Sequence, residues 1–307
     1  MIDGPASESP ENGFRSGFVA VVGRPNVGKS TLVNKLVGQK VSITSPQPQT
    51  TRGPIRGVRN GPGYQAVFVD TPGSQKPRDT LRSRMQQQVL DSLSGSDAIL
   101  FLLDAPQAAE TLGTGDRYVA RLVAESSTPT IVCLNKVDLM RTPAEVLPVV
   151  EAASELGDWR EIFPISAAEN LNLEPLMDAV IELLPPGPRY FPEGMVTDYP
   201  ESLVLAEYVR EKALTVLREE VPHSVAVEIE EVEPKDSVTV VYATIHVERA
   251  TQRMIVLGRG GKTIKQIGTE ARRDVERLLG TRIYLDLQVK VSPGWRSNRK
   301  FLERLGL

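Results

Sequence analysis

The chain has 307 residues, of which 40% are hydrophobic and 24% are charged, and its formal net charge is −3 at pH 7. This length favours two domains, each large enough to bury its own core. A slightly acidic chain does not bind nucleic acid indiscriminately, so any RNA contact has to come from a local basic patch. No apolar run is long enough to cross a bilayer, and the first residues lack the order of a signal peptide, so we expect a cytoplasmic protein.

The cysteine and histidine content excludes two further classes of protein. The single cysteine, Cys133, rules out an internal disulfide and lies in an apolar run, where a small buried residue is expected. Because the two histidines, His223 and His246, are separated from it and from each other, no zinc-type ligand cluster can form.

A short apolar run near the N-terminus leads into a glycine-rich turn. Val19–Val22 can form a buried strand, Gly23–Ser30 reads G-R-P-N-V-G-K-S, and Thr31 opens an amphipathic helix. This is the G-x-x-x-x-G-K-[ST] pattern of a phosphate-binding loop, in which glycines let backbone N–H groups converge on an anion at the positive end of a helix. We expect Lys29 to reach the β- and γ-phosphates and Ser30 to ligate magnesium. The alternative, a turn with an unrelated lysine, does not account for these flanks.

Apolar runs then alternate with helical patterns through the first half of the chain. The expected strands cover residues 66–69, 98–103, 130–134 and 162–165. Such alternation predicts a mostly parallel sheet with helices on both faces and ligand-bearing loops at the carboxyl ends of its strands. We therefore expect the loops at Gly23, Asp70, Asn135 and Ser166 to share one edge of the sheet.

The sequence Asp70-Thr71-Pro72-Gly73 follows one of these strands. An aspartate at a strand end can hold magnesium through a water molecule, and Gly73 leaves its N–H free to meet the γ-phosphate, so the loop can sense whether that phosphate is present. Taken alone, the pattern is also that of an ordinary turn, and it gains weight only beside a phosphate loop.

The sequence Asn135-Lys136-Val137-Asp138 predicts recognition of guanine. The Asp138 carboxylate can accept two hydrogen bonds, from the N1–H and the exocyclic amine of guanine, and adenine offers no such pair. The Asn135 amide can reach N7 or tie neighbouring loops together, and the Lys136 stem can cover the base. The backbone N–H groups of residues 166–168 would meet the guanine O6. ATP is therefore the less favoured nucleotide.

The pattern changes after a proline-rich stretch between residues 185 and 200. The elements expected beyond it are a helix at 201–219, strands at 225–232 and 238–247, a helix at 263–279, a strand at 283–291 and a short basic tail. These elements predict a separate α+β domain without a second phosphate loop.

Within this domain, Gly258-Arg259-Gly260-Gly261 contains the G-x-x-G turn of a KH domain, where glycines let the backbone approach a nucleic-acid strand. The alternative is a plain loop at a helix N-terminus. It is disfavoured by the basic residues around the turn, which are Arg253, Arg259, Lys262, Lys265, Arg272 and Arg273. For Arg272 and Arg273, the alternative that they belong to a solvated helix face remains. The apolar residues that could line a base-binding groove are Ile255, Leu257, Ile264 and Ile267.

Four motifs in this order resemble the translation-factor class of small GTPases, over Gly17 to about Leu184. The phosphate loop and Gln49-Thr50-Thr51-Arg52 resemble its Era and tRNA-modifying branch. The C-terminal half resembles the Era family. The stretches that carry this resemblance are Thr197-Asp198, Ala206–Lys212, Val221–Val225, Val289–Val291 and Gly294-Trp295. Ser292-Pro293, where lysine is common, and Gln75, where histidine is common, depart from the family pattern.

The composition predicts a disordered tail at 1–16, which is rich in Ser, Pro, Glu and Gly, and a stiff proline-rich linker at 186–202. The resemblance implies an α/β P-loop GTPase domain at 17–185 and an α+β KH domain of type II at 203–307. It implies binding of GTP or GDP with Mg²⁺, hydrolysis of GTP, binding of 16S rRNA near its 3′ end, and a role in assembly of the small (30S) ribosomal subunit. For some relatives it implies a fraction at the inner face of the cell membrane, although this sequence carries no amphipathic or lipidation signal. No obligate oligomer is implied.

The predicted site residues follow from the motifs and the resemblance. The catalytic ones are Lys29, Thr51 and Gly73, and the magnesium ligands are Ser30, Thr51 and Asp70. The nucleotide-binding residues are Gly23, Asn26, Val27, Gly28, Lys29, Ser30, Thr31, Asp70, Asn135, Lys136, Asp138, Ser166, Ala167 and Ala168. The RNA-binding residues are Gly258, Arg259, Gly260, Gly261, Lys262, Lys265 and Lys290.

Ser74 stands where Ras-like enzymes have a water-orienting glutamine, so we expect slow intrinsic hydrolysis. In related tRNA-modifying GTPases an asparagine of the phosphate loop helps to hold a potassium ion, and Asn26 matches that position. Two other functions stay open. A tRNA-modifying GTPase is disfavoured by the KH-like domain and by the lack of a cysteine near the C-terminus. An RNA-binding scaffold with GTP as a structural ligand is kept open by the missing glutamine.

Overall fold

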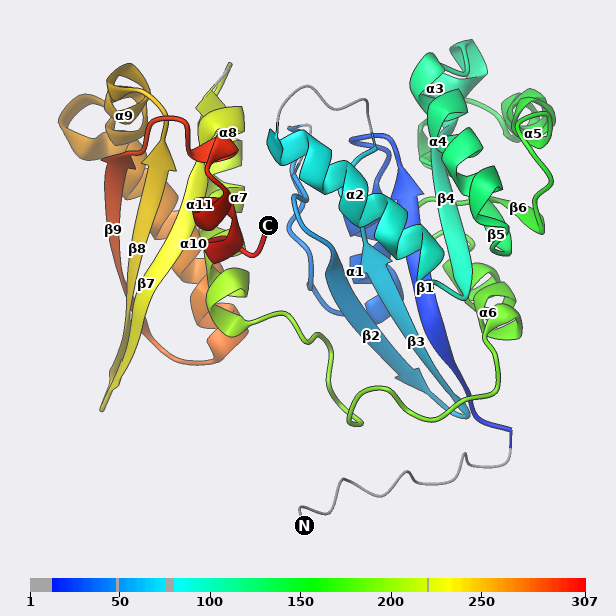
Figure 1. The fold of residues 1–307 in the computed structure, drawn as a ribbon, viewed down its shortest axis with the longest axis horizontal. Helices are drawn as coiled ribbons and strands as arrows, with labels where there is room; N and C mark the ends of the chain where they lie inside the picture. Colours follow the sequence, from blue (N-terminus) through cyan, green and yellow to red (C-terminus); the bar gives the residue numbers. More distant parts are fainter. Residues whose placement is uncertain (1–12, 48–49, 75–79, 220) are drawn as a thin grey trace. The chain divides into compact units, whose positions relative to one another are not determined.

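The computed structural model describes residues 13–47, 50–74, 80–219 and 221–307. The chain divides into two compact units (Figure 1). The first consists of residues 1–42, 54–75 and 87–198, and the second of residues 43–53, 76–86 and 199–307. Two short segments from the first half of the sequence therefore belong to the C-terminal unit. Most of the expected disordered tail, residues 1–12, lies outside the described residues, whereas Arg15 and Ser16 already belong to the first strand.

The first unit is built on a six-stranded sheet with the order β2-β3-β1-β4-β5-β6. Its strands are β1 (Arg15–Gly23), β2 (Ile55–Gly61), β3 (Tyr64–Asp70), β4 (Ala98–Asp104), β5 (Thr130–Asn135) and β6 (Glu161–Pro164). All pairs are parallel except β2–β3. The antiparallel edge strand β2 is not among the expected strands, because its sequence Ile-Arg-Gly-Val-Arg-Asn-Gly has no continuous apolar run.

Helices cover both faces of this sheet (Figure 1). On one face lie α1 (Lys29–Val37) and α6 (Leu173–Leu183), which pack against alternate residues of β1, such as Val19 and Val21. On the other face lie α2 (Thr80–Ser94), α3 (Ala105–Glu110), α4 (Thr114–Ser126) and α5 (Val146–Ser154), which pack against Ala20 and Val22. Alternate side chains of a strand point to opposite faces, so an unbroken apolar run is buried from both sides.

The parallel strands bring their carboxyl ends to one edge of the sheet. In the register, Val21 pairs with Asp70, Gly23 with Leu102 and Asp104 with Asn135. Ser166 follows β6 after Ile165. The expectation that four loops share this edge is confirmed, and β4 adds a fifth through Asp104.

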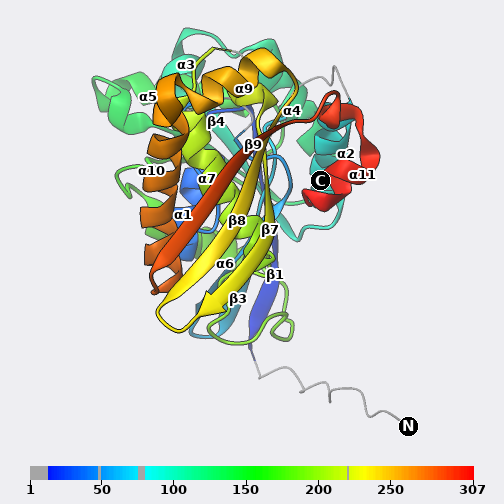
Figure 2. The same cartoon turned by 90° about the vertical axis from the view of Figure 1, so that its left-hand side faces the viewer.

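The second unit contains a three-stranded sheet with the order β7-β8-β9, in which β7 and β8 are antiparallel and β8 and β9 are parallel. The strands are β7 (Ala226–Lys235), β8 (Val238–Val247) and β9 (Ile283–Val291). The helices are α7 (Glu201–Val216), α8 (Val221–Ser224), α9 (Ala250–Leu257), α10 (Lys262–Leu279) and α11 (Arg299–Arg304). Figure 2 looks onto the sheet, with α7 and α10 behind it. Apart from the short helices α8 and α11, the elements follow the order α-β-β-α-α-β, which agrees with the expected type II KH fold.

The segment Ile43–Gly53 belongs to the second unit, although it falls within residues 17–185, the range expected for the GTPase domain. The Glu211 carboxylate accepts the backbone N–H of Thr44 at 2.9 Å, and Arg52 Nη1 donates to the Val225 carbonyl at 2.7 Å. Side chains and backbone of the second unit thus provide hydrogen-bond partners for a backbone group of this polar segment and for its arginine.

None of the helices in the described part of the chain combines the length and the apolar character that a bilayer-spanning helix needs.

Candidate nucleotide and RNA sites

The phosphate loop joins β1 to α1, and two of its glycines are required by close approaches. A Cβ at Gly28 (φ 102°) would lie 2.2 Å from Nδ2 of Asn135, and a Cβ at Gly23 (φ 154°) would lie 2.7 Å from the carbonyl oxygen of Leu102. A side chain at either position would displace backbone or a buried amide. The loop can therefore curl closely enough for its N–H groups to surround an anion.

Lys29 opens α1 and is 6% exposed. Its Nζ donates to the carbonyl oxygens of Gly23 at 3.1 Å and Arg24 at 2.9 Å. Burial lowers the pKa of Lys29 to about 8, although the nearby Asp70 carboxylate acts in the opposite direction. The two carbonyl groups are neutral acceptors, so the ammonium group lacks full charge compensation, and the phosphates of a nucleotide would supply it.

The loop after β3 packs closely on the phosphate loop. The backbone N–H of Ser74 donates to the Gly23 carbonyl at 3.1 Å. A Cβ at Gly73 would lie 2.8 Å from the backbone nitrogen of Pro25. Any other residue at position 73 would separate the two loops, which explains the glycine at the position expected to meet the γ-phosphate.

Ser74 does not replace the missing glutamine in this structure. Its side chain is buried, and among the described residues its hydroxyl has no hydrogen-bond partner. Among the described residues, the structure therefore shows no contact through which Ser74 could orient a water molecule.

The residues at this edge suit a magnesium ion held mainly by a nucleotide. Ser30 stands in the first turn of α1, and Asp70 is fully buried at the end of β3. Hydroxyl and carboxylate oxygens are ligands that Mg²⁺ prefers, and Mg²⁺ usually needs only one or two protein ligands besides phosphates and water. No group of three or more His, Cys, Asp or Glu side chains in the described ranges could hold a metal by itself. This donor set fits a nucleotide-bound Mg²⁺ and does not fit a separate metal centre.

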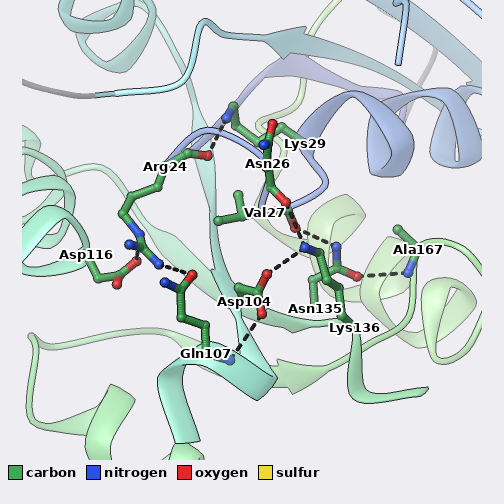
Figure 3. Close-up of polar contacts among 10 residues, drawn as sticks. All are labelled: Arg24, Asn26, Val27, Lys29, Asp104, Gln107, Asp116, Asn135, Lys136 and Ala167. Atoms are coloured by element: carbon green, nitrogen blue, oxygen red, sulfur yellow. Dashed lines mark hydrogen bonds and ion pairs between the residues drawn. The ribbon is translucent and has the colours of Figure 1, made fainter. Parts of the chain in front are cut away.

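Asn135 ties three loops together (Figure 3). Its Nδ2 donates to the Val27 carbonyl at 2.7 Å, and its Oδ1 accepts the backbone N–H of Ala167 at 2.9 Å. The side chain is buried. Of the two roles open to it in the sequence, the structure shows the one that connects neighbouring loops.

Lys136 joins the same network from the surface. It has φ 70°, and its Nζ donates to the Asn26 carbonyl at 2.8 Å and to Asp104 Oδ2 at 2.6 Å (Figure 3). The ion pair with Asp104 fixes the direction of the lysine stem, which is expected to cover the base. The next carboxylate of the motif, Asp138, is exposed.

A second branch of the network holds the other side of the phosphate loop. Arg24 Nε donates to Asp116 Oδ1 at 2.7 Å, and Arg24 Nη2 donates to the side-chain oxygen of Gln107 at 2.6 Å. The backbone N–H of Gln107 in turn donates to Asp104, which caps α3 (Figure 3).

Asp104, Gln107 and Asp116 are not among the site residues predicted from the sequence. Asp104 carried a usable signal, because it is a carboxylate at the end of an expected strand. Gln107 and Asp116 carried none, since nothing in the sequence places α3 or the start of α4 beside the phosphate loop.

Two of the three backbone N–H groups of residues 166–168 already have acceptors within the chain. The Ser166 N–H donates to the Leu171 carbonyl at 3.2 Å, and the Ala167 N–H donates to Asn135. The N–H of Ala168 has no intramolecular acceptor within the part of the chain that the structure describes. Ala167 and Ala168 therefore remain the available donors for a guanine O6, with that of Ala167 shared.

The glycine turn of the second unit is open and backbone-rich. Gly258, Gly260 and Gly261 all have positive φ angles, of 70°, 58° and 75°. A Cβ at Gly260 or Gly261 would meet nothing within 4 Å, whereas at Gly258 it would lie 2.9 Å from the backbone nitrogen of Thr263. Gly258 thus sets the tight turn between α9 and α10, and the other two leave backbone that a nucleic-acid strand can approach.

The predicted basic residues of the RNA site, Lys262, Lys265 and Lys290, are all exposed, as is Arg259. The expectation for Ile267 is wrong, because it is fully buried in the core of the unit and cannot line a groove. It lies on the face of α10 that packs against the sheet, where the apolar period of the helix places it.

The predicted magnesium ligands do not all come from one unit. Ser30 and Asp70 belong to the first unit, whereas Thr51 belongs to the second. The neighbouring carbonyl of Thr50 accepts a hydrogen bond from Arg210 of α7, which also pairs with Glu207.

Comparison with known proteins follows this division. A family profile described as a 50S ribosome-binding GTPase matches residues 18–136, and a KH domain profile matches residues 220–296. GTPase Era of Lacticaseibacillus paracasei is 45% identical over 292 residues, which cover 95% of this chain and 96% of that protein. This chain belongs to the Era family. The expected GTPase activity and fold class are thereby confirmed.

Two solved Era structures resemble the chain, each with a TM-score of 0.92 and 40% identity, covering 95% of this chain and 99% of theirs. One is Era in complex with MgGDPNP and nucleotides 1506–1542 of 16S ribosomal RNA. The other is a variant of Aquifex aeolicus Era bound to GDP and AlF4⁻.

We predict that Asp104→Asn in this Era-family protein weakens GDP binding by about tenfold or more, because a charge-assisted hydrogen bond contributes roughly 1.5–3 kcal/mol. The asparagine can still cap α3, so thermal stability should change little, whereas Asp104→Ala should lose both the affinity and the cap. Calorimetric titration with GDP measures the effect. Asp178→Ala, which removes an exposed carboxylate of α6, is the control. Unchanged affinity in Asp104→Asn would contradict a positioning role for the ion pair.

We also predict that GDP binds about fourfold more weakly at pH 8.5 than at pH 7.0, because the free protein has a Lys29 pKa of about 8 and the bound phosphates raise it. Protonated Lys29 predominates below pH 8, so the affinity is highest there and falls as the pH rises through the pKa of the free form. Lys29→Gln should bind weakly at both pH values. Lys35→Gln, on the exposed side of the same helix, should keep the wild-type dependence. A pH-independent wild-type affinity would be inconsistent with this role of Lys29.

Proposed function

We propose that this chain is a slow GTPase switch that binds 16S rRNA near its 3′ end through the Gly258–Gly261 turn and assists maturation of the small ribosomal subunit. The observation that carries the proposal is the open glycine turn, with exposed Arg259 and Lys262 beside it. The other unit of the same chain carries the residues predicted to bind a guanine nucleotide. The rRNA complex of a 40% identical Era supports the choice of RNA.

In the nucleotide site, each residue has a role that its surroundings support. The buried ammonium group of Lys29 would bind the β- and γ-phosphates, and Asp138 would accept the N1–H and amine of guanine. Lys136 would cover the base in the direction that Asp104 fixes. Asn135 joins the loops that would surround the nucleotide.

Magnesium would be held by Ser30 and, through water, by Asp70, with Thr51 completing the shell. When bound, Mg²⁺ neutralises charge on the β- and γ-phosphates. Gly73 would offer its N–H to the γ-phosphate, and its lack of a side chain lets it lie against Pro25.

Thr51 gives the nucleotide a connection to the KH unit. Its segment, Ile43–Gly53, is part of that unit, where Arg210 and Glu211 of α7 bind its backbone. Bound GTP and its magnesium would then act on a segment that belongs to the RNA-binding unit. Because the γ-phosphate is present in GTP and absent from GDP, the RNA affinity would depend on which nucleotide is bound.

A potassium ion would support hydrolysis in this chain, which has Ser74 in place of a catalytic glutamine. The side chain of Asn26 is exposed at the tip of the phosphate loop, where φ is 66°, while its carbonyl is held by Lys136. An amide oxygen in this place can ligate a cation next to the phosphates and offset the charge that develops during hydrolysis.

The proposal predicts that the complexes with a GTP analogue and with GDP bind an RNA from the 16S 3′ end with affinities that differ by about fivefold or more. Filter binding at matched salt measures this, because RNA affinity depends steeply on salt. Gly260→Asp should abolish RNA binding in both states without changing GDP affinity. Phosphate release that is above background and lost in Lys29→Ala would exclude a scaffold with structural GTP. Equal RNA affinities in the two states would refute the switch.

The potassium hypothesis predicts faster GTP turnover in KCl than in NaCl at the same ionic strength. Asn26→Ala should remove this difference while GDP still binds, because the backbone carbonyl that Lys136 uses is retained. Steady-state phosphate release in the two salts is the measurement. If the wild type turns over equally fast in both, potassium has no role.

A further inference from the structure

The basic character of the RNA-binding unit extends beyond the glycine turn, along one face of α10. Lys262 and Lys265 start this face, and Arg272 follows seven residues later, which places the three on the same side of the helix. All three are exposed, while Ile267 and Ala271 on the opposite face are buried. With 18 residues the helix is about 27 Å long. A ridge of positive charge therefore leads away from the turn.

The ridge ends at a hollow of 790 Å³ at the far end of α10, where β8 and β9 begin. Figure 2 shows these ends of the three elements at its lower left. Among the residues that line it are Arg272, Arg277, Arg282, Glu276 and Tyr284. Three arginines and one glutamate make the lining net positive in a chain whose overall charge is −3. Such local charge selects for an anionic partner.

Two of these arginines, Arg272 and Arg277, form only exposed ion pairs within the protein, and Arg282 is exposed as well. Arg272 lies 3.9 Å from Glu276 and its side chain is 49% exposed, and Arg277 lies 3.1 Å from Asp274 and is 78% exposed. Exposed ion pairs of this kind contribute little to stability. The guanidinium groups can therefore exchange these carboxylates for phosphates at small cost.

Tyr284 supplies an aromatic surface beside these charges. Its side chain is 59% exposed, although tyrosine is usually more buried, and it stands at the second position of the edge strand β9. Exposed aromatic rings next to arginines are the combination on which unpaired bases stack. An acidic peptide would bind the arginines but would not account for the exposed aromatic ring.

We propose that this hollow is a second RNA subsite, which binds the single-stranded continuation of the RNA that crosses the glycine turn. A base stacks on Tyr284, and the adjoining phosphates contact Arg272 and Arg282. The ridge from Lys262 to Arg272 carries the strand between the two subsites. This inference rests on the proposed function, since it extends the same RNA.

The test compares two fluorescent RNAs by anisotropy. The first is a core of about four nucleotides, the length that a KH turn clamps, and the second is the same core with unpaired nucleotides added at its 5′ or 3′ end. The wild type should bind one of the extended RNAs more tightly than the core. Arg272→Ala/Arg282→Ala should lose about tenfold on that RNA and lower its salt slope by about 1.4, while binding the core normally. Tyr284→Leu should lose about fivefold or more on the same RNA, and Tyr284→Phe should retain it.

Arg218→Ala, at an exposed site in the same unit but outside the hollow, is the matched control and should bind both RNAs as the wild type does. Because the substituted residues are exposed, the variants should keep the wild-type melting temperature. A wild type that binds neither RNA would refute the proposed function. Equal binding of the core and both extensions, or losses in the variants that are equal on core and extended RNA, would refute only the subsite. Polyglutamate that displaces the extension but not the core would assign the hollow to acidic protein and also overturn the proposal.

Discussion

The buried side-chain amide of Asn135 is the contact on which the nucleotide site depends. One amide donates to the loop after β1 and accepts from the loop after β6, so three loops from separate strands become one surface. Gly28 is required for the same reason, because any Cβ there would overlap the amide nitrogen. A residue that reads as part of a base-recognition motif is also the clamp that fixes the phosphate loop.

The remaining polar contacts give this surface its charge pattern. Asp104 fixes Lys136 on one side, and Asp116 with Gln107 fixes Arg24 on the other, so each cation beside the loop has a set direction. Lys29 is the exception, since it is buried against neutral carbonyl oxygens. The surroundings of Lys29 therefore favour a negatively charged ligand, and the phosphates of a nucleotide would supply that charge.

The second unit uses glycine for a different purpose. At Gly260 and Gly261 the space above the backbone is open, so glycine there serves approach by another molecule, whereas Gly28 and Gly73 serve approach within the protein. The same unit includes the segment Ile43–Gly53, which carries Thr51. The polar backbone of this segment has hydrogen-bond partners in α7.

The sequence alone determined the features that depend on local spacing. The apolar runs predicted the parallel sheet, the G-x-x-x-x-G-K-[ST] and Asn-Lys-Val-Asp patterns predicted the ligand, and the G-x-x-G turn predicted the RNA-binding domain, because each pattern carries its own geometry. Only the tertiary structure placed Gln107 and Asp116 beside Arg24, moved Ile267 from the groove into the core, and assigned Ile43–Gly53 to the second unit. These facts depend on which side chains distant in sequence meet after the helices pack. No local pattern encodes such a meeting, since a glutamine on a helix or a polar loop has the same sequence signature wherever it comes to lie.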